Sequence, residues 1–462
     1  MSNMSRPTLL DMPTMGRSPR RVGSTYFIRT FGCQMNDHDS ERIAGLLDTD
    51  GMRRVDRAED ADLVVLNTCT IRDNADQKLY GYLGSLKSTK EARPGMRIAV
   101  GGCAAQKDRD LVRERAHWVD VVFGTHNTHR VLDLLDHVDE WGPVTEVWEQ
   151  TTNLDDIPSH LPVQRESEHS AWVTVTVGCN NSCTFCIVPI VRGREISRRP
   201  GDIIGEVEGL VAEGVVEITL LGQNVNSYGR DLDLNGRRPL FADLLRRVGG
   251  VDGIRRIRYT SPHPKDIKED VVYAMAETPS VVDQLHLPLQ SGSDRILAAM
   301  HRGYTAHRFL AKLAMARDII PGLSASTDVI VGFPGETEED FERTMAVMAE
   351  ARFDNAFMFQ FSPRPGTPAA DMSEQVDHAV VKERFDRLVE QQNRITFELN
   401  QAAVGGRTQV LVEGPSRRDA SVVTARTEGN RIVHVAGTFR PGSFLDVRIT
   451  RAAPHYLEGE PV

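Results

Sequence analysis

Residues 177–186 read Val177-Gly178-Cys179-Asn180-Asn181-Ser182-Cys183-Thr184-Phe185-Cys186 and contain half of the cysteines in the chain. Their spacing, C-x3-C-x2-C, provides three thiols, whereas a structural zinc site needs four protein ligands. Three thiolates can hold a cluster of four irons and leave the fourth iron open to a small molecule. The spacing therefore predicts an iron–sulfur cluster. A zinc knuckle completed by a distant histidine and a group of buried thiols are the alternatives.

The other three cysteines, Cys33, Cys69 and Cys103, stand 36 and 34 residues apart, each after a strand-like apolar run. These runs lie at 26–32, 61–68 and 97–102, and residues 39–49 show the spacing of a helix. Strands that alternate with helices form a parallel sheet, in which ligand sites lie at the carboxyl ends of the strands. We therefore expect these cysteines to converge on a second three-ligand cluster, with ordinary buried cysteines as the alternative.

Two names are used below for these groups. The loop triplet is Cys179, Cys183 and Cys186, and the strand-end triplet is Cys33, Cys69 and Cys103.

Length and composition are those of a multidomain globular protein. At about 150 residues per domain, 462 residues suggest two to four domains, and 40% apolar residues are enough for well-formed cores. The net charge of −10 argues against a protein that coats nucleic acid non-specifically, but it allows a local basic face. The polar start of the chain, the lack of a long apolar span and the few cysteines predict a cytoplasmic protein without a membrane segment.

Changes in composition divide the chain into five segments. Residues 1–23 are predicted to be a disordered tail, 24–140 the three-cysteine α/β domain, and 141–168 an acidic linker. Residues 169–399 alternate between strand and helix patterns, and 400–462 contain short β-like runs. The predicted fold class is α/β: a parallel-sheet domain, a central partial (β/α) barrel with its chemistry at the strand ends, and a small C-terminal β-barrel.

In the central domain, strands are predicted at 172–177, 216–221, 256–259, 284–289, 326–331 and 355–361, with helices that include 200–213 and 338–350. Polar side chains at or near the ends of these strands could hold S-adenosylmethionine (SAM), which can chelate an open iron and be cleaved reductively. Gln223, Asn224 and Asp328 are the candidates, and Ser291 or Ser293 would cap a helix. Ordinary turn chemistry before a helix is the alternative for each loop.

The C-terminal segment is basic within an acidic protein. Its β-like runs lie at 408–414, 420–426, 431–435 and 444–450, and residues 401–451 hold eight arginines, no lysines and four acidic residues. Arginine is favoured for phosphate and base contacts because its planar fork donates in pairs and stacks on bases. We expect RNA contacts from this segment, and a solvated barrel surface is the alternative. The candidate residues are Arg407, Arg417, Arg418, Arg426 and Arg431.

A second basic stretch follows the loop triplet. It contains Arg192, Arg194, Arg198 and Arg199. These side chains could face a polyanion or pair with Glu195 and other acids.

These motifs and their order resemble one family, the methylthiotransferases of the radical-SAM class. The resemblance covers about residues 24–460 as an N-terminal cysteine domain, a radical-SAM core and a TRAM domain. Residues 30–36 (Thr-Phe-Gly-Cys-Gln-Met-Asn) look like the tRNA branch of the family. Residues 67–72, 178–189 and 192–198 fit its other motifs, and all six cysteine positions are filled.

The resemblance implies two [4Fe-4S] clusters and SAM as cofactors. The cluster on the loop triplet would bind SAM and donate one electron to give a 5′-deoxyadenosyl radical. Phe185, just before the last cysteine, is a further candidate for cofactor binding. That radical would take hydrogen from C2 of N6-dimethylallyladenosine beside the anticodon of tRNA. The cluster on the strand-end triplet would supply sulfur, which a second SAM would methylate.

The same resemblance implies several partners. The basic TRAM barrel would hold the anticodon stem-loop of tRNA, so binding should weaken steeply with salt. A flavodoxin- or ferredoxin-type electron donor and a sulfur donor are also implied. The protein is expected to be monomeric and to bind no membrane.

Three alternative functions remain open. One sibling branch methylthiolates an aspartate of a small-subunit ribosomal protein, and another acts on threonylcarbamoyl-adenosine in tRNA. The context of residues 34–36 and the arginine-rich barrel weigh against the protein substrate. A non-catalytic iron–sulfur RNA-binding protein is disfavoured because redox and structural clusters are normally fully ligated.

Overall fold

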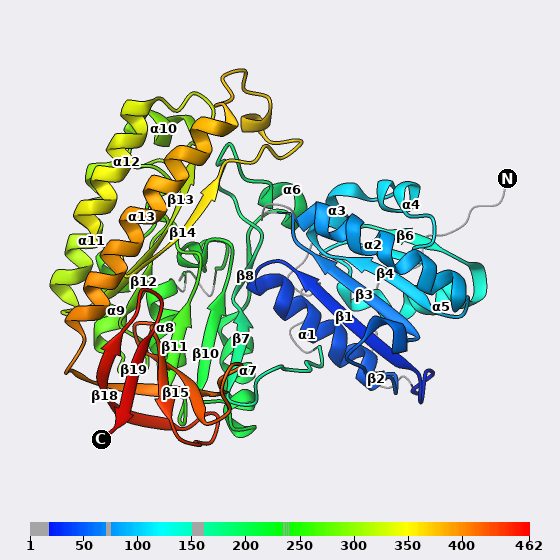
Figure 1. The fold of residues 1–462 in the computed structure, drawn as a ribbon. Helices are drawn as coiled ribbons and strands as arrows, with labels where there is room; N and C mark the ends of the chain where they lie inside the picture. The colour runs from blue at the N-terminus through cyan, green and yellow to red at the C-terminus, as the bar shows by residue number, and fades with distance from the viewer. Residues whose placement is uncertain (1–17, 71–74, 150–160, 234–235, 237, 239) are drawn as a thin grey trace. The chain divides into compact units, whose positions relative to one another are not determined.

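The structure is a computed structural model that describes residues 18–70, 75–149, 161–233, 236, 238 and 240–462. It divides into two units, and Figure 1 labels most of their helices and strands. The N-terminal unit contains Met1–Glu166 and Ile190–Arg192, and the C-terminal unit contains Ser167–Pro189 and Gly193–Val462. None of the helices in the described part of the chain combines the length and apolar character needed to span a bilayer.

The N-terminal unit is built on a six-stranded sheet in the order β2-β1-β3-β4-β5-β6, in which all neighbours run parallel. Its strands are β1 (Thr25–Phe31), β2 (Arg53–Arg54), β3 (Leu63–Thr68), β4 (Arg97–Gly101), β5 (Val121–Phe123) and β6 (Val144–Glu146). Every residue of β3 is buried, as expected for a parallel strand that is covered on both faces. The strand order turns back at β1, so the point between β1 and β3 is where such sheets commonly bind ligands.

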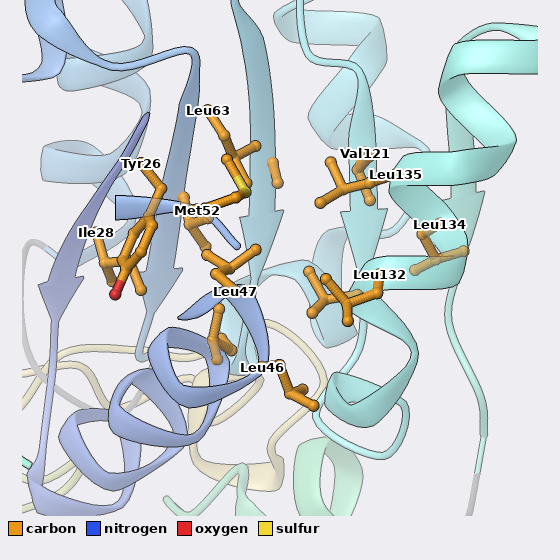
Figure 2. Close-up of a cluster of buried hydrophobic side chains, with 14 of the residues drawn as sticks. Tyr26, Ile28, Leu46, Leu47, Met52, Leu63, Val121, Leu132, Leu134 and Leu135 are labelled. Carbon is orange, nitrogen blue, oxygen red and sulfur yellow. The ribbon is translucent and has the colours of Figure 1, made fainter. Parts of the chain in front are cut away.

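Helices cover both faces of this sheet. They are α1 (Gln34–Thr49), α2 (Ala75–Ala92), α3 (Cys103–Asp108), α4 (Leu111–Arg115) and α5 (Val131–Trp141). Figure 2 shows the core under α1 and α5, where Leu46, Leu47 and Leu132 meet strand residues such as Leu63 and Val121. A second core joins α2, α3 and α4 to the opposite face. The unit therefore has three layers.

The C-terminal unit begins with six parallel strands arranged as two sheets, β11-β10-β7 and β12-β13-β14. The strands are β7 (Ser170–Thr174), β10 (Glu217–Leu221), β11 (Arg256–Tyr259), β12 (Gln284–His286), β13 (Ser324–Val331) and β14 (Asn355–Gln360). A single parallel bridge from Ile257 to Val281 links β11 to the segment before β12. The predicted central fold of strands that alternate with helices is confirmed.

The helices between these strands are α7 (Pro200–Ala212), α8 (Phe241–Gly249), α9 (Glu269–Glu277), α10 (Asp294–Ala299), α11 (Ala306–Ile319), α12 (Glu338–Ala351) and α13 (His378–Ala402). The short helix α6 (Val188–Arg192) follows the loop triplet. Ser293 caps α10 by accepting a hydrogen bond from the Ile296 amide, so the predicted serine cap is confirmed at this position.

The C-terminal residues form a closed barrel of β15 (Arg407–Pro415), β16 (Val422–Thr427), β17 (Ile432–Ala436), β18 (Phe444–Ala452) and β19 (Leu457–Pro461). The four predicted runs are confirmed. Sequence reasoning missed β19, because its residues LEGEP are mostly types depleted in strands. The strand pairs with both β17 and β18 and so closes the barrel.

Two buried arginines of β11 tie this barrel to the sheet next to it. Arg256 donates to the carbonyls of Arg426 and Gln409 at 2.9 and 3.1 Å. Arg258 donates to the carbonyls of Glu428 and Thr427 at 2.7 and 3.0 Å. Because these acceptors are backbone atoms, the contacts hold the barrel without using up its own arginine side chains.

Several predicted boundaries differ from the observed ones. The strand predicted at 172–177 is broken into β7 and β8 (Thr176–Val177), which turns to pair with β9 (Ile196–Ser197). Helix α1 starts at Gln34 rather than 39, directly after Cys33. Residues 1–17 of the predicted tail and 150–160 of the predicted linker lie outside the described residues. Within those two segments the structure describes ion pairs of Arg21 and the strand β6.

Candidate active site

The structure places the strand-end triplet at three neighbouring strand ends. Cys33 follows β1 and stands at the N-cap of α1, Cys69 follows β3, and Cys103 is the first residue of α3 after β4. The strands β1, β3 and β4 are adjacent and parallel, so their carboxyl ends meet at one edge of the sheet. Cysteines that are up to 70 residues apart in the chain are thereby brought into one group.

The three thiols of this group interact directly. Cys69 is hydrogen-bonded to both Cys33 and Cys103. The hydrogen bond from Cys69 lowers the pKa of Cys33 to about 5 against the opposing effect of burial, and nearby Arg192 acts in the same direction as Cys69. The same bond lowers the pKa of Cys103, whereas the pKa of Cys69 is raised. Cys33 and Cys103 are therefore prepared to present thiolates, the form that binds iron.

Two asparagines and two glycines shape this edge of the sheet. Asn36 donates to Oδ1 of Asn67 at 3.1 Å, and Asn67 donates to the Asn36 carbonyl at 2.8 Å. A Cβ on Gly102, which has φ +88°, would lie 2.2 Å from Asn67 Oδ1, and one on Gly32 would lie 2.7 Å from Cys69 Cβ. Only glycine permits this close approach. Sequence reasoning quoted these residues in motifs but assigned them no role.

A buried ion pair stands beside the strand-end triplet. Arg192 is 4% exposed and donates to Asp39 at 2.8 Å. Although burial opposes its charge, the neighbouring Cys103, Asp39 and Cys33 raise the pKa of Arg192. The predicted basic stretch is therefore divided. Arg192 and Arg198 are buried and paired with Asp39 and Glu206, whereas Arg194 and Arg199 are exposed.

The loop triplet is held by backbone bonds of its own loop and of neighbouring segments. The Cys179 amide donates to the Gly193 carbonyl at 3.2 Å, and the Cys186 amide donates to the Cys183 carbonyl at 3.1 Å. A Cβ on Gly178 (φ +77°) would lie 2.1 Å from the carbonyl oxygen of Arg194, so this turn requires glycine. Burial raises the pKa of Cys179 and raises that of Cys186 to about 12.

Phe185 anchors the loop in an apolar cluster. It packs against the buried cluster of Ile296, Met300, Phe333 and Ala369. Phe333 follows β13, so this packing places Phe185 near the carboxyl end of that strand. Phe185 therefore packs within the protein, and its predicted contact with the cofactor stays a prediction.

The polar candidates near the strand ends have different surroundings. Both side-chain polar atoms of Gln223 are buried without a partner, as is Oδ1 of Asn224, whose Nδ2 donates to Asp266 at 2.9 Å. Asp328 lies on β13, and its carboxylate is 3.4 Å from Nε2 of His286. Unpaired buried polar atoms are costly, so Gln223 and Asn224 suit a polar ligand such as SAM.

Two further groups near strand ends were missed by sequence reasoning. Nε2 of His263, after β11, and Oε1 of Gln290, after β12, are also buried without a partner. Burial and the charges of Arg302, Lys265 and Lys312 lower the pKa of His263 to about 2, so its ring is neutral. Nδ1 accepts from the Lys265 amide at 3.2 Å, and Nε2 is thus left as a hydrogen-bond donor.

The donor chemistry of the two triplets fits iron–sulfur clusters, because each triplet provides three thiols and no fourth ligand is needed. Among the described residues, no group of three or more histidine, cysteine or acidic side chains is spaced to hold a metal ion as it stands.

The five arginines predicted to bind RNA fall into two groups. Arg407, Arg417 and Arg418 are exposed on the barrel. Arg426 donates to Glu413 at 2.6 Å, and Arg431 is paired with Asp354. In the barrel, Arg407 stands opposite Arg448, which is also exposed and which sequence reasoning did not select.

Family models match the chain in the predicted order. Uncharacterized protein family UPF0004 matches residues 25–124, the Radical SAM superfamily matches 173–348, and the TRAM domain matches 401–462.

Two relatives match almost the full chain. A tRNA-2-methylthio-N(6)-dimethylallyladenosine synthase of Streptomyces coelicolor is 54% identical over 460 residues, which cover 97% of this chain and 90% of the relative. One of Mycolicibacterium vanbaalenii is 53% identical over 453 residues, which cover 96% and 88%.

Solved structures resemble the chain in fold. The radical S-adenosylmethionine methyltransferase TsrM from Kitasatospora setae, with cobalamin and a [4Fe-4S] cluster bound, matches with a TM-score of 0.54 at 14% identity. The match covers 75% of this chain and 77% of that one. The cobalamin-dependent radical enzyme OxsB matches with a TM-score of 0.50 at 13% identity and covers 80% and 56%.

Proposed function

Because this chain belongs to the tRNA-2-methylthio-N(6)-dimethylallyladenosine synthase family, we propose that it methylthiolates C2 of N6-dimethylallyladenosine beside the anticodon of tRNA. The observation that carries the proposal is that all six cysteines fall into two triplets, one at strand ends and one in a loop, within a chain that matches a relative over 97% of its length. The family membership weighs against a non-catalytic RNA-binding protein.

The two triplets have separate roles in this proposal. Cys179, Cys183 and Cys186 would hold the [4Fe-4S] cluster at which SAM is reductively cleaved. When bound, this cluster and SAM supply a one-electron reaction that produces a carbon radical. Cys33, Cys69 and Cys103 would hold the second cluster, and that cluster would provide the transferred sulfur. The hydrogen bonds from Cys69 support this assignment for Cys33 and Cys103, because they lower the pKa of those two thiols toward the thiolate form that iron needs.

Gln223, Asn224 and Asp328 are proposed to contact SAM. The support is strongest for Gln223 and Asn224, since their buried polar atoms have no protein partner and would gain one from the ligand. His263 is added to this set because its neutral ring keeps a buried donor free at Nε2. Phe185 would hold the loop in place by packing.

The C-terminal barrel is proposed to bind the anticodon stem-loop. Arg407, Arg417 and Arg418 would contact phosphates, because they are exposed and no ion pair with a described residue occupies them. Arg426 and Arg431 would contribute less, since each already has a carboxylate partner. Residues 24–140, 169–399 and 400–462 are the proposed functional domains, and they contain the three matched regions.

Further partners follow from the chemistry. A flavodoxin- or ferredoxin-type protein would supply electrons, and a separate donor would replace the transferred sulfur. We expect a monomer in the cytoplasm, where thiols stay reduced and tRNA is present.

Mass spectrometry of nucleosides from total tRNA of cells that lack this protein tests the proposal. The methylthio derivative of dimethylallyladenosine should disappear while its precursor accumulates, and the wild-type gene should restore it. An unchanged nucleoside would contradict the substrate assignment. Threonylcarbamoyl-adenosine and the ribosomal protein aspartate would then be measured in the same cells.

A further inference from the structure

Arg302 carries a buried positive charge next to the loop triplet. The residue is 5% exposed, and each of its three guanidinium nitrogens has an acceptor. Nε donates to Tyr304 Oη at 3.1 Å, Nη1 to Cys183 Sγ at 3.2 Å, and Nη2 to the Pro288 carbonyl at 3.4 Å. Across the described residues, no carboxylate stands at ion-pair distance from Arg302. The positive charge is therefore held without a carboxylate partner among the described residues.

Most other deeply buried arginines of the protein differ in this respect. Arg192 is paired with Asp39 at 2.8 Å, Arg258 with Glu217 at 3.0 Å, and Arg384 with Glu336 at 3.1 Å. Arg256 has no carboxylate partner among the described residues, but its guanidinium group donates to two backbone carbonyls. Arg302 instead directs one nitrogen to sulfur, which is a weak acceptor as a thiol and a much stronger one as a thiolate. A buried charge is costly unless it is compensated, so this arrangement suits a negatively charged group bound through Cys183.

The backbone around Arg302 fixes its position relative to the loop. Thr184 donates from its amide to the Met300 carbonyl at 3.2 Å and from its hydroxyl to the Ala299 carbonyl at 2.9 Å. His301, between Met300 and Arg302, has φ +55°, which is uncommon for a residue other than glycine. The end of α10 thus holds the residue after Cys183 and turns sharply to bring Arg302 back to its sulfur.

We propose that Arg302 is a positioning residue that stabilises the reduced state of the cluster on the loop triplet. This inference rests on the proposed function, because it requires Cys183 to be a cluster ligand. The electron comes from the external reductant and enters the cluster, and no covalent bond forms or breaks. Net charge and hydrogen bonds to the sulfurs set the potentials of such clusters. A guanidinium at 3.2 Å from a ligand sulfur offsets the added negative charge and raises the potential.

The test measures the reduction potential of the full-length reconstituted protein. Cys33, Cys69 and Cys103 are all changed to Ala, so that one cluster remains and its reduced signal can be followed by electron paramagnetic resonance. In this background, Arg302→Gln should lower the potential. We expect about a tenfold smaller ratio of reduced to oxidised cluster at a fixed potential, which for one electron corresponds to about 59 mV. Arg302→Lys, which keeps the charge but not the fork, should lower the potential less.

Arg343→Gln is the matched control. It removes the same charge from the C-terminal unit at an exposed site, where Arg343 is paired with Glu339, and it should leave the potential unchanged. An equal shift in the control, or no shift in Arg302→Gln, would overturn the inference. Loss of iron from both Arg302 variants would do so as well, since it would show a role in cluster assembly.

The proposed function can fail separately. If the three-cysteine background itself binds no iron, Cys179, Cys183 and Cys186 hold no cluster, and their assignment is wrong before Arg302 is considered. About four irons per chain in the background, with the potential unmoved by Arg302→Gln, would remove only the inference on Arg302.

Discussion

The two cysteine triplets reach three-thiol sites by different routes. The strand-end triplet is assembled by the sheet, and its thiols are hydrogen-bonded to one another beside the Arg192–Asp39 pair. The loop triplet comes from eight consecutive residues, and burial raises the pKa of Cys179 and Cys186. Its neighbouring arginine, Arg302, has no carboxylate partner among the described residues and bonds to sulfur instead.

The difference concerns where the counter-charge comes from. Beside the strand-end triplet, Asp39 forms an ion pair with Arg192, and the thiols are hydrogen-bonded to one another. Beside the loop triplet, the charge of Arg302 faces the sulfur of Cys183 and would face the cluster that this cysteine is proposed to hold. A site that must change its charge by one electron gains from a cation that no carboxylate neutralises. A site that stores or passes on sulfur has no such need.

Loss of one cysteine from each triplet should have the largest effect and should separate their roles. Cys69→Ala is expected to abolish methylthiolation while SAM cleavage to 5′-deoxyadenosine continues, because only the sulfur-providing cluster is lost. Cys183→Ala should abolish both activities. Iron should fall from about eight to about four per chain in either variant. If Cys69→Ala also stopped SAM cleavage, the division of roles would be wrong.

The second largest difference should appear in the stability of the iron-free protein. Asp39→Asn leaves the buried Arg192 without its carboxylate, and breaking such a pair costs about 3–5 kcal/mol. Arg302→Gln leaves no carboxylate unpaired, so it should reduce the free energy of unfolding by less than half as much. Urea denaturation of both variants measures the two values. Equal losses would show that Arg302 has an anionic partner in the iron-free chain.

Affinity for SAM should change by a smaller factor. Gln223→Ala removes a side chain whose polar atoms have no protein partner, so a hydrogen bond of about 0.5–1.5 kcal/mol to the ligand would be lost. The Kd for SAM, measured by calorimetry on the reconstituted protein, should rise about two- to tenfold. Gln391→Ala on α13, where the side chain bonds to the Met345 carbonyl, serves as the control. A rise in both variants would point to a general effect on the fold.

The smallest expected effects concern tRNA binding. Arg407→Ala should reduce the slope of log Kd against log salt by about one, because one phosphate contact is lost. Arg426→Ala should change it less, since Arg426 is already bonded to Glu413. Filter binding of the anticodon stem-loop at several salt concentrations measures the salt slopes of the two variants. Equal slopes for the two variants would mean that exposure does not decide which arginines bind.

Much of the fold followed from patterns that are local in the chain. The α/β class and the four runs of the C-terminal barrel were predicted correctly, because strand periodicity repeats within a few residues. The break between β7 and β8 and the existence of β19 were not predicted. Both depend on pairing with strands distant in the chain, which overrides the weak local preference.

The site shows the same limit. The two triplets and the loops that carry Gln223 and Asn224 were found because their residue types and spacing are chemical signals in themselves. Arg302 was missed because it stands 119 residues from Cys183, in a segment without a recognisable motif. His263 was missed for a similar reason. A single histidine does not indicate a ligand contact until its burial and its unpaired Nε2 are known.

The sequence by itself determined the ligand types, their grouping into two triplets and the order of domains, because these are encoded in residue identity and spacing. Only the tertiary structure decided which charges face the thiols, which polar atoms remain unpaired and which arginines of the barrel are exposed. Those properties depend on burial and on partners that are far away in the chain, and neither is set by local sequence.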